Sequence, residues 1–453
     1  MSICFFCRSA AFGLILVLAC VAGSGCRKTP TTPTTATTPA LDSAENPSRS
    51  TGPATATVVK DDPAAMAALQ EAGFLLKQNS DGVVTDFSVA SQTDISASMT
   101  HLAGLPNLQS ATFTGPGISD QGMQGIASLD QLKRLDFTDT AIGAETLKAI
   151  GQVESLEVLA LRRTGVSDED LAALASLPKL RALDLRNTNI SDAGMVHVAK
   201  LKTLSDLQLE KSKVTDSGLT YLKDLPLTSF NVNYCTTVSD ESMPMLGAIK
   251  TLRFLQMDAT KLTDKGMASV AGLSNLERLR IHYCDVTGEG IAHLAGLKQL
   301  SRLELRGTSV DDAALAIIGK LPAVAYVDLA ECRLPSATGM TNLAKLRGAT
   351  YLGFWETKFN DESMAGLEGL PKLQTLDLKA TAISDEAIKS ILTLPELTTL
   401  TLSATQVTDE GFRQLSQLPK LKSLHVANTQ IGYDVIEELQ KAKPDLEVID
   451  FEG

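Results

Sequence analysis

The sequence of 453 residues is poor in the side chains that chemistry and large globular cores usually need. Aromatic residues make up only 4% of it, although 44% of the residues are apolar. Five histidines and seven cysteines leave little material for metal or thiol chemistry. A core must therefore be built from Leu, Ile, Val, Ala and Met, which is unusual for a row of ordinary globular domains.

Positive charge and catalytic motifs are scarce as well. The formal net charge is −12, and general binding of nucleic acid requires cationic patches that neutralise phosphates. The chain has no phosphate-binding glycine loop, no His-Glu-x-x-His motif and no Gly-x-Ser-x-Gly motif. We therefore expect no nucleic-acid partner, no cofactor, no metal site and no enzymatic activity.

The longest apolar run lies near the N-terminus, at residues 10–22, after the single cation Arg8. Its length suits a signal-peptide core and is too short for a comfortable membrane span. The run leads into Gly23-Ser24-Gly25-Cys26, followed by Arg27 and Lys28. This ending resembles a bacterial lipoprotein lipobox, and the resemblance implies that Cys26 is lipidated and becomes the mature N-terminus.

Alternatives to lipidation at Cys26 stay open. Gly23 stands where lipoboxes usually have Leu, and Val17-Leu18-Ala19-Cys20 fits that position better but leaves a shorter apolar core. Simple cleavage or an uncleaved anchor is a further alternative. Every version implies export, so we interpret residues 1–26 as a signal peptide and expect the mature chain in the cell envelope.

Residues 27–60 predict a disordered tether. The stretch 29–39 is almost entirely Thr and Pro, and the rest of the segment has no apolar periodicity. Such a segment cannot bury enough surface to offset the entropy lost on ordering. A lipidated Cys26 followed by this segment would hold the body of the protein off a membrane surface.

From Val84 to the end, the sequence repeats with a period of about 24 residues. Each unit follows the pattern L-x-x-L-x-L-x-x-T-x-I-S/T-D-x-G-L-x-x-L-x-x-L. We name each unit by its first residue, and these are Val84, Leu108, Leu132, Leu156, Leu180, Leu204, Leu227, Leu252, Leu276, Leu300, Val324, Ala349, Leu373, Leu397, Leu421 and, for a final strand, Leu446. The pattern resembles that of leucine-rich repeat proteins and covers about 370 of the 453 residues.

The fold follows from the two periods within one unit. Alternating Leu at the fourth and sixth positions predicts a short strand, and later apolar residues at helical spacing predict one buried helix face. A single unit cannot bury both faces, so the units must stack. We expect an α/β solenoid over residues 84–453, with about fifteen repeats and a final strand, parallel strands on the concave face and helices on the convex face. The resemblance implies the same ribonuclease-inhibitor-like horseshoe.

Residues 61–83 predict an N-terminal helical cap. Pro63 follows Asp62 at a helix start, and apolar residues at 66, 69, 72 and 76 have helical spacing. We therefore expect a helix over 62–78 that covers the exposed core of the first unit.

Position nine of the unit is where the chain must turn away from the strand, and it is usually Thr. A hydroxyl there can bond neighbouring backbone groups, so the position predicts an internal ladder. Cys235, Cys284 and Cys332 occupy the same position in alternate units, about 9 to 10 Å apart, which is too far for a disulfide. We interpret them as ladder residues of the type found in the cysteine-containing repeat subfamily.

Two other recurrent residues have structural interpretations. His101, His197 and His293 share one position on the helical side, four units apart, and cannot converge on a metal ion. The Asp at position thirteen follows a Ser or Thr, which fits a helix start with a hydroxyl cap and an anion near the positive end of the helix dipole. Capping explains this Asp better than a calcium ladder does.

The candidate binding surface lies on the concave strands from the Leu227 unit to the Ala349 unit. Aromatic and arginine side chains dominate binding hot spots, and here they occupy positions that project from the sheet. The alternative is that they are ordinary strand positions, which favour aromatic residues. The candidate residues are Tyr234, Phe254, Arg278, Arg280, His282, Tyr283, Arg302, Glu304, Arg306, Tyr326, Asp328, Tyr351 and Trp355.

A second, smaller group contains only arginines. It either extends the binding surface, binds an acidic partner or is a simple solvated face, and its members are Arg134, Arg162, Arg163, Arg181 and Arg186.

One carboxylate pair could in principle be catalytic. Glu304 and Asp328 occupy position five of adjacent strands, so their carboxylates could approach the roughly 5 Å separation of a retaining glycosidase. Arg280, Arg302 and Arg306 are expected to hold both carboxylates ionised, and an open sheet offers no pocket. A carbohydrate-active enzyme is therefore only the third interpretation.

The repeat style also resembles that of eukaryotic F-box adaptors, but residues 61–83 are too few for an F-box. It is more similar to secreted or membrane-tethered repeat proteins of environmental bacteria. We expect an exported, membrane-tethered module that binds a protein, peptide or glycan on its concave face. The alternative is a structural envelope component without a discrete ligand.

We predict that the mature chain begins at Cys26 and carries lipid there, because the apolar run at residues 10–22 leads into a lipobox-like segment that ends at this cysteine. Mass spectrometry of the native N-terminus measures this directly. An unmodified N-terminus, or one that begins elsewhere, would refute lipidation at Cys26.

Overall fold

The structure is a computed structural model that describes residues 59–333 and 336–451. The expected signal peptide, its lipidation site Cys26 and residues 27–58 of the expected tether lie outside the described residues. No helix of the described ranges is long and apolar enough to cross a membrane.

The strands of the described residues form one 17-stranded sheet. The first strand pairs antiparallel with the second, and from the second onward each strand lies parallel to the next along the chain. The strands are β1 (Leu75–Gln78), β2 (Val84–Ala90), β3 (Ser110–Thr114), β4 (Arg134–Thr138), β5 (Val158–Arg162), β6 (Ala182–Asp184), β7 (Asp206–Gln208), β8 (Ser229–Asn231), β9 (Phe254–Gln256), β10 (Arg278–Arg280), β11 (Arg302–Glu304), β12 (Tyr326–Asp328), β13 (Tyr351–Gly353), β14 (Thr375–Asp377), β15 (Thr399–Thr401), β16 (Ser423–His425) and β17 (Glu447–Ile449).

Each unit returns from its strand through a short helix. The α-helices are α1 (Pro63–Glu71), α2 (Ser96–Met99), α3 (Ala144–Ile150), α4 (Asp192–Val198), α5 (Asp216–Leu219), α6 (Met243–Leu246), α7 (Asp264–Val270), α8 (Gly288–Ala292), α9 (Asp312–Ile318), α10 (Ala337–Met340), α11 (Asp361–Met364), α12 (Ile388–Ile391), α13 (Asp409–Gln414) and α14 (Tyr433–Ala442). Single 3-10 turns replace or flank them at η1 (Thr100–Gly104), η2 (Met123–Ser128), η3 (Asp170–Leu174), η4 (Thr220–Asp224), η5 (Asp240–Ser242), η6 (His293–Gly296), η7 (Thr341–Lys345), η8 (Ala365–Leu367), η9 (Asp385–Ala387) and η10 (Leu415–Gln417).

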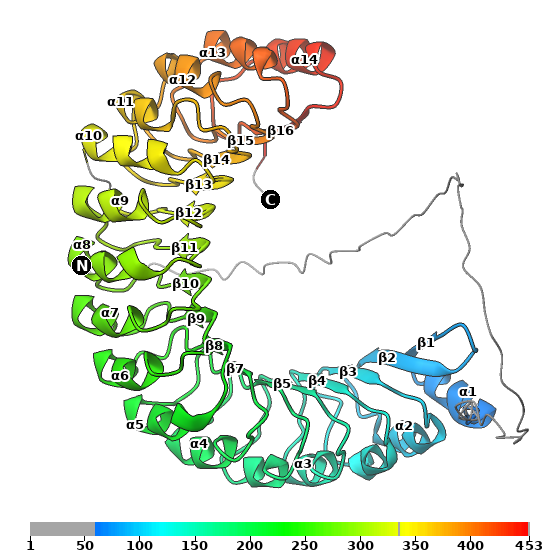
Figure 1. Cartoon of the computed structure of the whole chain (residues 1–453). Helices are drawn as coiled ribbons and strands as arrows, with labels where there is room; N and C mark the ends of the chain where they lie inside the picture. The colour runs from blue at the N-terminus through cyan, green and yellow to red at the C-terminus, as the bar shows by residue number, and fades with distance from the viewer. Residues whose placement is uncertain (1–58, 334–335, 452–453) are drawn as a thin grey trace, which may run out of the picture. The chain divides into compact units, whose positions relative to one another are not determined.

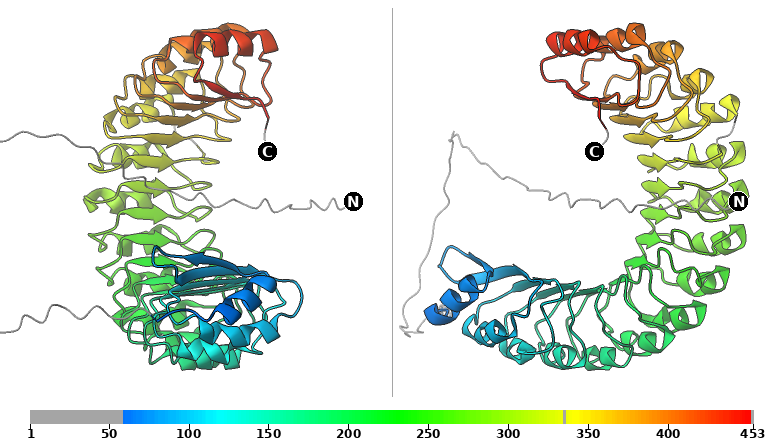
Figure 2. Two further views of the ribbon diagram at one scale, coloured as in Figure 1. Left: turned by 90° about the vertical axis from the view of Figure 1, so that its right-hand side faces the viewer. Right: turned by 180° about the vertical axis from the view of Figure 1, so that it is seen from behind.

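The repeat body has the layers that the periodicity predicts. Its strands line the inner side of a curve and its helices the outer side (Figure 1), and the same two layers are seen from the other directions in Figure 2. The leucines at the first, fourth and sixth positions lie between the layers, as Leu300, Leu303 and Leu305 do with no exposed surface. The expected α/β leucine-rich repeat solenoid is confirmed.

The N-terminal cap differs from the expected helix over 62–78. Helix α1 begins after Asp62, whose side chain accepts the N–H of Ala64 at 2.9 Å, and ends at Glu71. Gly73, with φ of +88°, turns the chain, and the next residues form strand β1 against β2. Apolar spacing through residue 76 suggested a longer helix, but the left-handed Gly73 stops it and Leu75 is left 73% exposed.

Position eight is left-handed in every unit from Leu108 to Leu421. The chain makes its turn here, and among these positions Gly115 and Gly307 are glycine and Asn187 and Asn428 are asparagine, the residues that this conformation favours. The twelve units without glycine hold a side chain at φ between +51° and +59°. The strained, left-handed backbone at position eight is therefore a feature of the repeat itself and recurs in successive units.

The ladder at position nine is confirmed, with two different bonding schemes. Thr308 donates its hydroxyl to the carbonyl of Leu305 in its own unit, at 2.6 Å. Cys332, one unit later, donates its thiol to that same Leu305 carbonyl at 3.1 Å. Threonine thus closes the turn of its own unit, whereas cysteine connects two neighbouring units.

The Asp at position thirteen also connects neighbouring units, in addition to its place at the start of a helix. Asp264 Oδ1 accepts the backbone N–H groups of Thr287 and Gly290 in the next unit, at 2.8 and 2.9 Å, and its Oδ2 accepts the Thr287 hydroxyl at 2.6 Å. Thr287 Oγ1 in turn accepts the N–H of Glu289 at 3.2 Å and so caps its own helix. We call the repeated pattern the aspartate ladder.

The aspartate ladder runs along most of the solenoid. Its junctions join Asp120 to Gly143, Asp168 to Ser191, Asp192 to Thr215, Asp216 to Ser239, Asp240 to Thr263, Asp264 to Thr287, Asp312 to Ser336, Asp361 to Ser384, Asp385 to Thr408, and Asp409 to Gly432. The ladder also explains the glycine at position fifteen, because a Cβ on Gly290 would collide with Asp264 Oδ1.

From the Leu108 unit onward, three junctions lack the Asp, and the following unit compensates. Gly288 replaces the Asp in the Leu276 unit, and the next helix is capped by Asp311, whose carboxylate occupies the space beside Gly288. Ala337 replaces it in the Val324 unit, and the next cap is Asn360. Ala144 replaces it in the Leu132 unit, and in the next unit the backbone N–H of Ser167 donates to Asp170 of its own unit instead.

We predict that Asp264→Ala destabilises the protein by about 1 to 3 kcal/mol, because the donors of Thr287 and Gly290 lose their acceptor. Urea unfolding followed by circular dichroism measures the change. The control is Asp285→Ala, which removes an exposed carboxylate two residues before Thr287. This change should cost about 0.5 kcal/mol or less. Equal effects of the two variants would show that the ladder contributes nothing to stability.

Candidate functional site

The thirteen candidate residues lie on six neighbouring strands, β8 to β13, or on the turns that follow them. We call them the concave patch. In-register pairing aligns Phe254, Arg278, Arg302, Tyr326 and Tyr351 in one row across the sheet. A second row holds Arg280, Glu304 and Asp328. The positions that follow the strands hold His282, Arg306 and Trp355, with Tyr234 and Tyr283 at the turns.

Glu304 is the anionic centre of the patch. Its side chain is buried, yet Oε1 accepts hydrogen bonds from Arg278 Nε at 2.7 Å and from Arg302 Nε at 2.6 Å. Burial alone would raise the pKa of this carboxyl, but the two guanidinium groups outweigh it and lower the pKa. One ionised carboxylate therefore fixes two arginines on adjacent strands.

A second buried carboxylate, Asp258, contacts Arg280 and His282. Arg280 Nη2 lies 2.7 Å from Asp258 Oδ2, and Asp258 Oδ1 accepts the backbone N–H of His282 at 3.0 Å. Asp258 has no exposed surface, and burial raises its pKa despite Arg280. Because Asp258 orients Arg280, that arginine is part of the framework and is less available as a free binding anchor.

His282 sits among three carboxylates. Its Nδ1 lies 3.6 Å from Asp258 Oδ2, and its Nε2 lies 4.0 Å from Glu304 Oε2 and 3.9 Å from Asp328 Oδ2. Burial, followed by the charge of Arg280, lowers the pKa of His282 to about 4, although Glu304 acts in the opposite direction. The imidazole is therefore neutral at pH 7, and its Nε2 makes no hydrogen bond within the described residues.

Arginine guanidinium groups pack against the aromatic rings of the concave patch. Tyr326 and Tyr351 stack with ring centres 4.0 Å apart and planes 4° from parallel, and the Arg302 guanidinium lies 3.7 Å from the Tyr326 ring centre. Arg306 lies 4.2 Å from the ring centre of Trp355 and forms an ion pair with Glu331. Cation–π contacts of this kind order both partners before any ligand arrives.

Tyr234 and Tyr283 are the most exposed aromatic residues of the patch, with 41% and 44% of their surface accessible. Both stand at the left-handed position eight, where a bulky side chain is unfavourable. The Tyr283 ring lies against Gly307 of the next unit, where a Cβ would collide with it, and its hydroxyl donates to Glu331 Oε2, two units away, at 3.0 Å.

The two carboxylates of the pair Glu304 and Asp328 differ in environment. Only Glu304 has a lowered pKa. Burial raises the pKa of Asp328, although the backbone N–H of Ala330 and the charge of Arg306 act in the opposite direction. Glu304 Oε1 accepts hydrogen bonds from two arginines, which makes this carboxylate a weaker nucleophile.

Sequence reasoning missed Asp258 as a framework residue. Asp258 stands at position seven of its unit, the position that His282 occupies in the following unit. In the sequence, its only distinguishing feature is that it is an isolated acidic residue one unit before Arg280. Glu331 is also not among the candidate residues, although it joins Arg306 to Tyr283.

The residues assigned structural roles lie where expected. Cys235, Cys284 and Cys332 are buried free thiols, and burial raises the pKa of the latter two to about 11. His101, His197 and His293 lie on the helical side. Within the described ranges, no three His, Cys, Asp or Glu residues are grouped so that they could hold a metal ion.

Comparison with known proteins places the repeats in a family. Residues 87–337 match the family described as a leucine-rich repeat region. No curated protein matches the chain.

Solved structures share the fold. A leucine-rich repeat protein of Leptospira interrogans is 20% identical, with a TM-score of 0.52, over 78% of this chain and 92% of that one. An internalin of Listeria monocytogenes is also 20% identical, with a TM-score of 0.45, over 87% and 96%. The mouse RP105/MD-1 complex matches at 15% identity and a TM-score of 0.50, over 76% and 71%.

We predict that His282 makes folding stability fall between pH 6.5 and about 4. An unfolded histidine takes up its proton near pH 6.5, whereas the folded protein admits it only near pH 4, so acid favours the unfolded chain over this window, by up to about 3 kcal/mol. The raised pKa values of Asp258 and Asp328 act in the opposite sense and stabilise the folded state on acidification.

The difference between wild type and His282→Gln isolates this contribution. Urea unfolding at pH 7, 5.5 and 4.5 should show a smaller loss of stability in the variant, while His293→Gln, which changes an exposed histidine, should retain the wild-type slope. Parallel slopes for wild type and His282→Gln would contradict the low pKa.

Proposed function

The chain belongs to the leucine-rich repeat proteins, and from this premise we propose that it is an exported, membrane-tethered recognition module that binds a protein, peptide or glycan through the concave patch. The module is non-enzymatic in this proposal. The observation that carries it is the continuous set of aromatic and arginine side chains over β8 to β13, held in place by buried carboxylates.

The fold supports a binding role. Leucine-rich repeat proteins commonly bind other proteins, and the mouse relative of the same fold is described in complex with a partner, MD-1. An open parallel sheet offers a long surface on which successive units each add contacts. Catalysis would require a water-excluding site, whereas Glu304, one of the two carboxylates best placed for it here, is bonded to two arginines.

The composition of the patch supports binding more specifically. Tyr, Trp and Arg are the residues most enriched in hot spots, and the patch contains the only tryptophan of the sequence. Its side chains are already ordered by stacking and ion pairs, so a ligand would lose less conformational entropy on binding them. The two strained tyrosines, Tyr234 and Tyr283, add exposed surface where the backbone would favour Gly or Asn.

Export and tethering are supported by the leader alone. The apolar run at residues 10–22 has the length of a signal-peptide core, and the cysteine after it, Cys26, precedes a Thr/Pro-rich segment suited to a tether. This arrangement would present the concave patch outside the cytoplasm.

We predict that the full chain, immobilised on beads, captures a partner from envelope extract and that the Tyr234→Ala, Tyr283→Ala double variant loses it. Loss of two hot-spot anchors should weaken binding by about 2 kcal/mol or more. The matched control is the Tyr221→Ala, Tyr433→Ala double variant, which removes two exposed tyrosines from the convex side. With the captured partner purified, the emission of Trp355 should move to shorter wavelength as its ring is desolvated.

The outcomes separate the alternatives. Equal capture by both double variants would move the binding surface away from the patch. Absence of capture by the wild type would favour a structural envelope component without a discrete ligand.

A further inference from the structure

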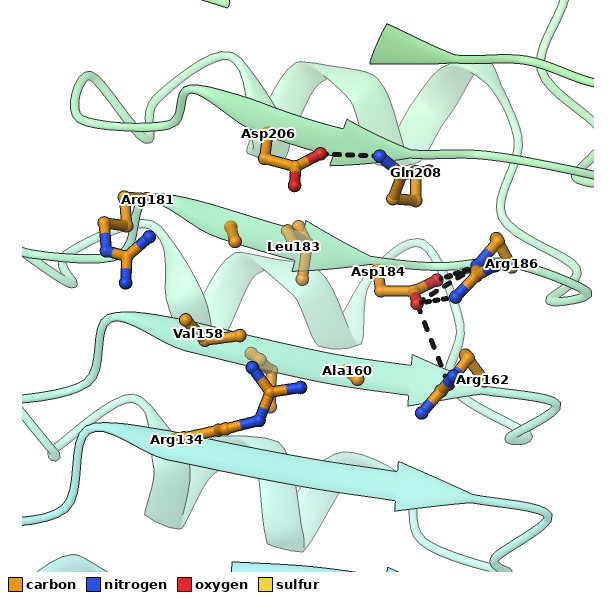
Figure 3. A pocket seen from close by; sticks show the side chains of 12 residues that line it. Arg134, Val158, Ala160, Arg162, Arg181, Leu183, Asp184, Arg186, Asp206 and Gln208 are labelled. Carbon is orange, nitrogen blue, oxygen red and sulfur yellow. Dashed lines mark hydrogen bonds and ion pairs between the residues drawn. The ribbon is translucent and has the colours of Figure 1, made fainter. Parts of the chain in front are cut away.

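A cavity of about 360 Å³ lies on the concave face over strands β4 to β7, which adjoin the strands of the concave patch along the sheet. Its floor is made of small apolar side chains, Val158, Ala160 and Ala182. Four of the five arginines of the second sequence cluster, Arg134, Arg162, Arg181 and Arg186, stand around this floor (Figure 3). The fifth, Arg163, faces outward in an ion pair with Asp139.

Of the two acids in the cavity wall, Asp184 is already paired with arginines. It accepts hydrogen bonds from Arg186 Nη2 at 2.7 Å and Nε at 2.9 Å, and Arg162 Nε lies 3.7 Å from its Oδ2. Asp206 accepts a hydrogen bond from the neutral amide of Gln208 at 2.6 Å. Neither carboxylate forms an ion pair with Arg134 or Arg181 in the described residues.

Arg134 differs from the other arginines around the cavity in its lack of an acidic partner. Within the described residues it forms no ion pair and no side-chain hydrogen bond, and Figure 3 shows its guanidinium extended from β4 toward β5, beside Val158. Arg181, on the same side of the cavity, makes a single bond to Glu157 at 3.1 Å and remains largely exposed. Two guanidinium groups with free donors thus stand at one end of an apolar floor, in a protein of net charge −12.

We propose that this cavity is a second recognition site, which binds the carboxylate side chains of an acidic peptide segment of a partner protein. Arg134 and Arg181 would each offer a planar pair of N–H donors, which matches the two oxygens of a carboxylate. The apolar floor would receive the backbone and methylene groups of the segment. Four arginines and two aspartates line the cavity, and Asp136 and Glu157 outside this lining pair with Arg162 and Arg181, so the unpaired guanidinium of Arg134 is the main attraction for an anion.

The lining favours a carboxylate peptide over other anions. No aromatic side chain lines the cavity to provide a stacking surface for sugar rings. Asp184 and Asp206 would repel the double charge of a phosphate more strongly than the single charge of a carboxylate. The small floor residues leave room for an extended chain, and its acidic side chains can reach outward to the arginines.

This site does not depend on the concave patch. The patch spans β8 to β13 and uses aromatic residues, whereas the cavity spans β4 to β7 and uses arginines. Parallel measurements on Tyr234→Ala, Tyr283→Ala and on Arg134→Gln therefore let either proposal fail while the other stands.

The test measures binding of a fluorescein-labelled peptide, Gly-Asp-Ala-Asp-Ala-Asp-Gly, to the full chain by fluorescence anisotropy at low salt. The Asp peptide should bind, and its Asn counterpart should bind at least tenfold more weakly. Arg134→Gln should weaken binding of the Asp peptide at least fivefold. This variant leaves no buried carboxylate without a partner, so folding should be preserved, and circular dichroism checks that.

Lys422→Gln is the matched control, because it removes one exposed cation at the start of a distant strand. It should leave the affinity unchanged. The proposal is overturned if Arg134→Gln binds as the wild type does, or if the Asp and Asn peptides bind equally. It is also overturned if oligogalacturonate or inorganic phosphate binds more tightly than the Asp peptide and displaces it, since the site would then be one for acidic glycans or for phosphate.

Discussion

The bond between a carboxylate and the start of the next helix is the constraint on which the rest of this solenoid depends. Each ladder aspartate, such as Asp264, holds the backbone and the hydroxyl of the cap in the following unit. The strand layer is spaced by its own hydrogen bonds, and the aspartate ladder sets the spacing of the helix layer. Gly290 and its equivalents are required by the same contact, since a side chain there would push the carboxylate away.

With that spacing fixed, the concave face becomes a regular array on which side chains can be arranged in rows. The array is too open to bury a charge by its backbone alone. Burial is achieved instead by neighbouring side chains, since Arg278 and Arg302 cover Glu304, and Arg280 lies against Asp258. The acids determine where the guanidinium groups lie, and the guanidinium groups in turn determine where the rings of Tyr326 and Trp355 lie.

Much of this architecture could be predicted from the sequence, because the same residue types recur at the same positions in many units. The strands, the helix side and the Thr/Cys ladder follow from residue types at fixed positions. The hydrogen bonds from the aspartate to the next unit were not predicted. The capping pattern in the sequence is the same whether the carboxylate bonds to its own helix or to the start of the next one. The left-handed turn at position eight was hidden by its occupants, since Arg163, Tyr234 and Glu331 do not favour that conformation. Contacts specific to one unit, such as that between Asp258 and Arg280, leave no periodic signal.

The three exceptional junctions have a consequence for how such a chain can be lengthened or shortened. A unit with the usual Asp at position thirteen can be followed by any unit with Ser or Thr at position twelve, so duplication or deletion of one such unit leaves the hydrogen bonds between units intact. The Leu276 and Leu300 units are different, because Asp311 matches Gly288 and would face a second carboxylate beside any ordinary neighbour. These two units must be inherited or transplanted as a pair, and an engineer who grafts repeats into this scaffold should cut on either side of them.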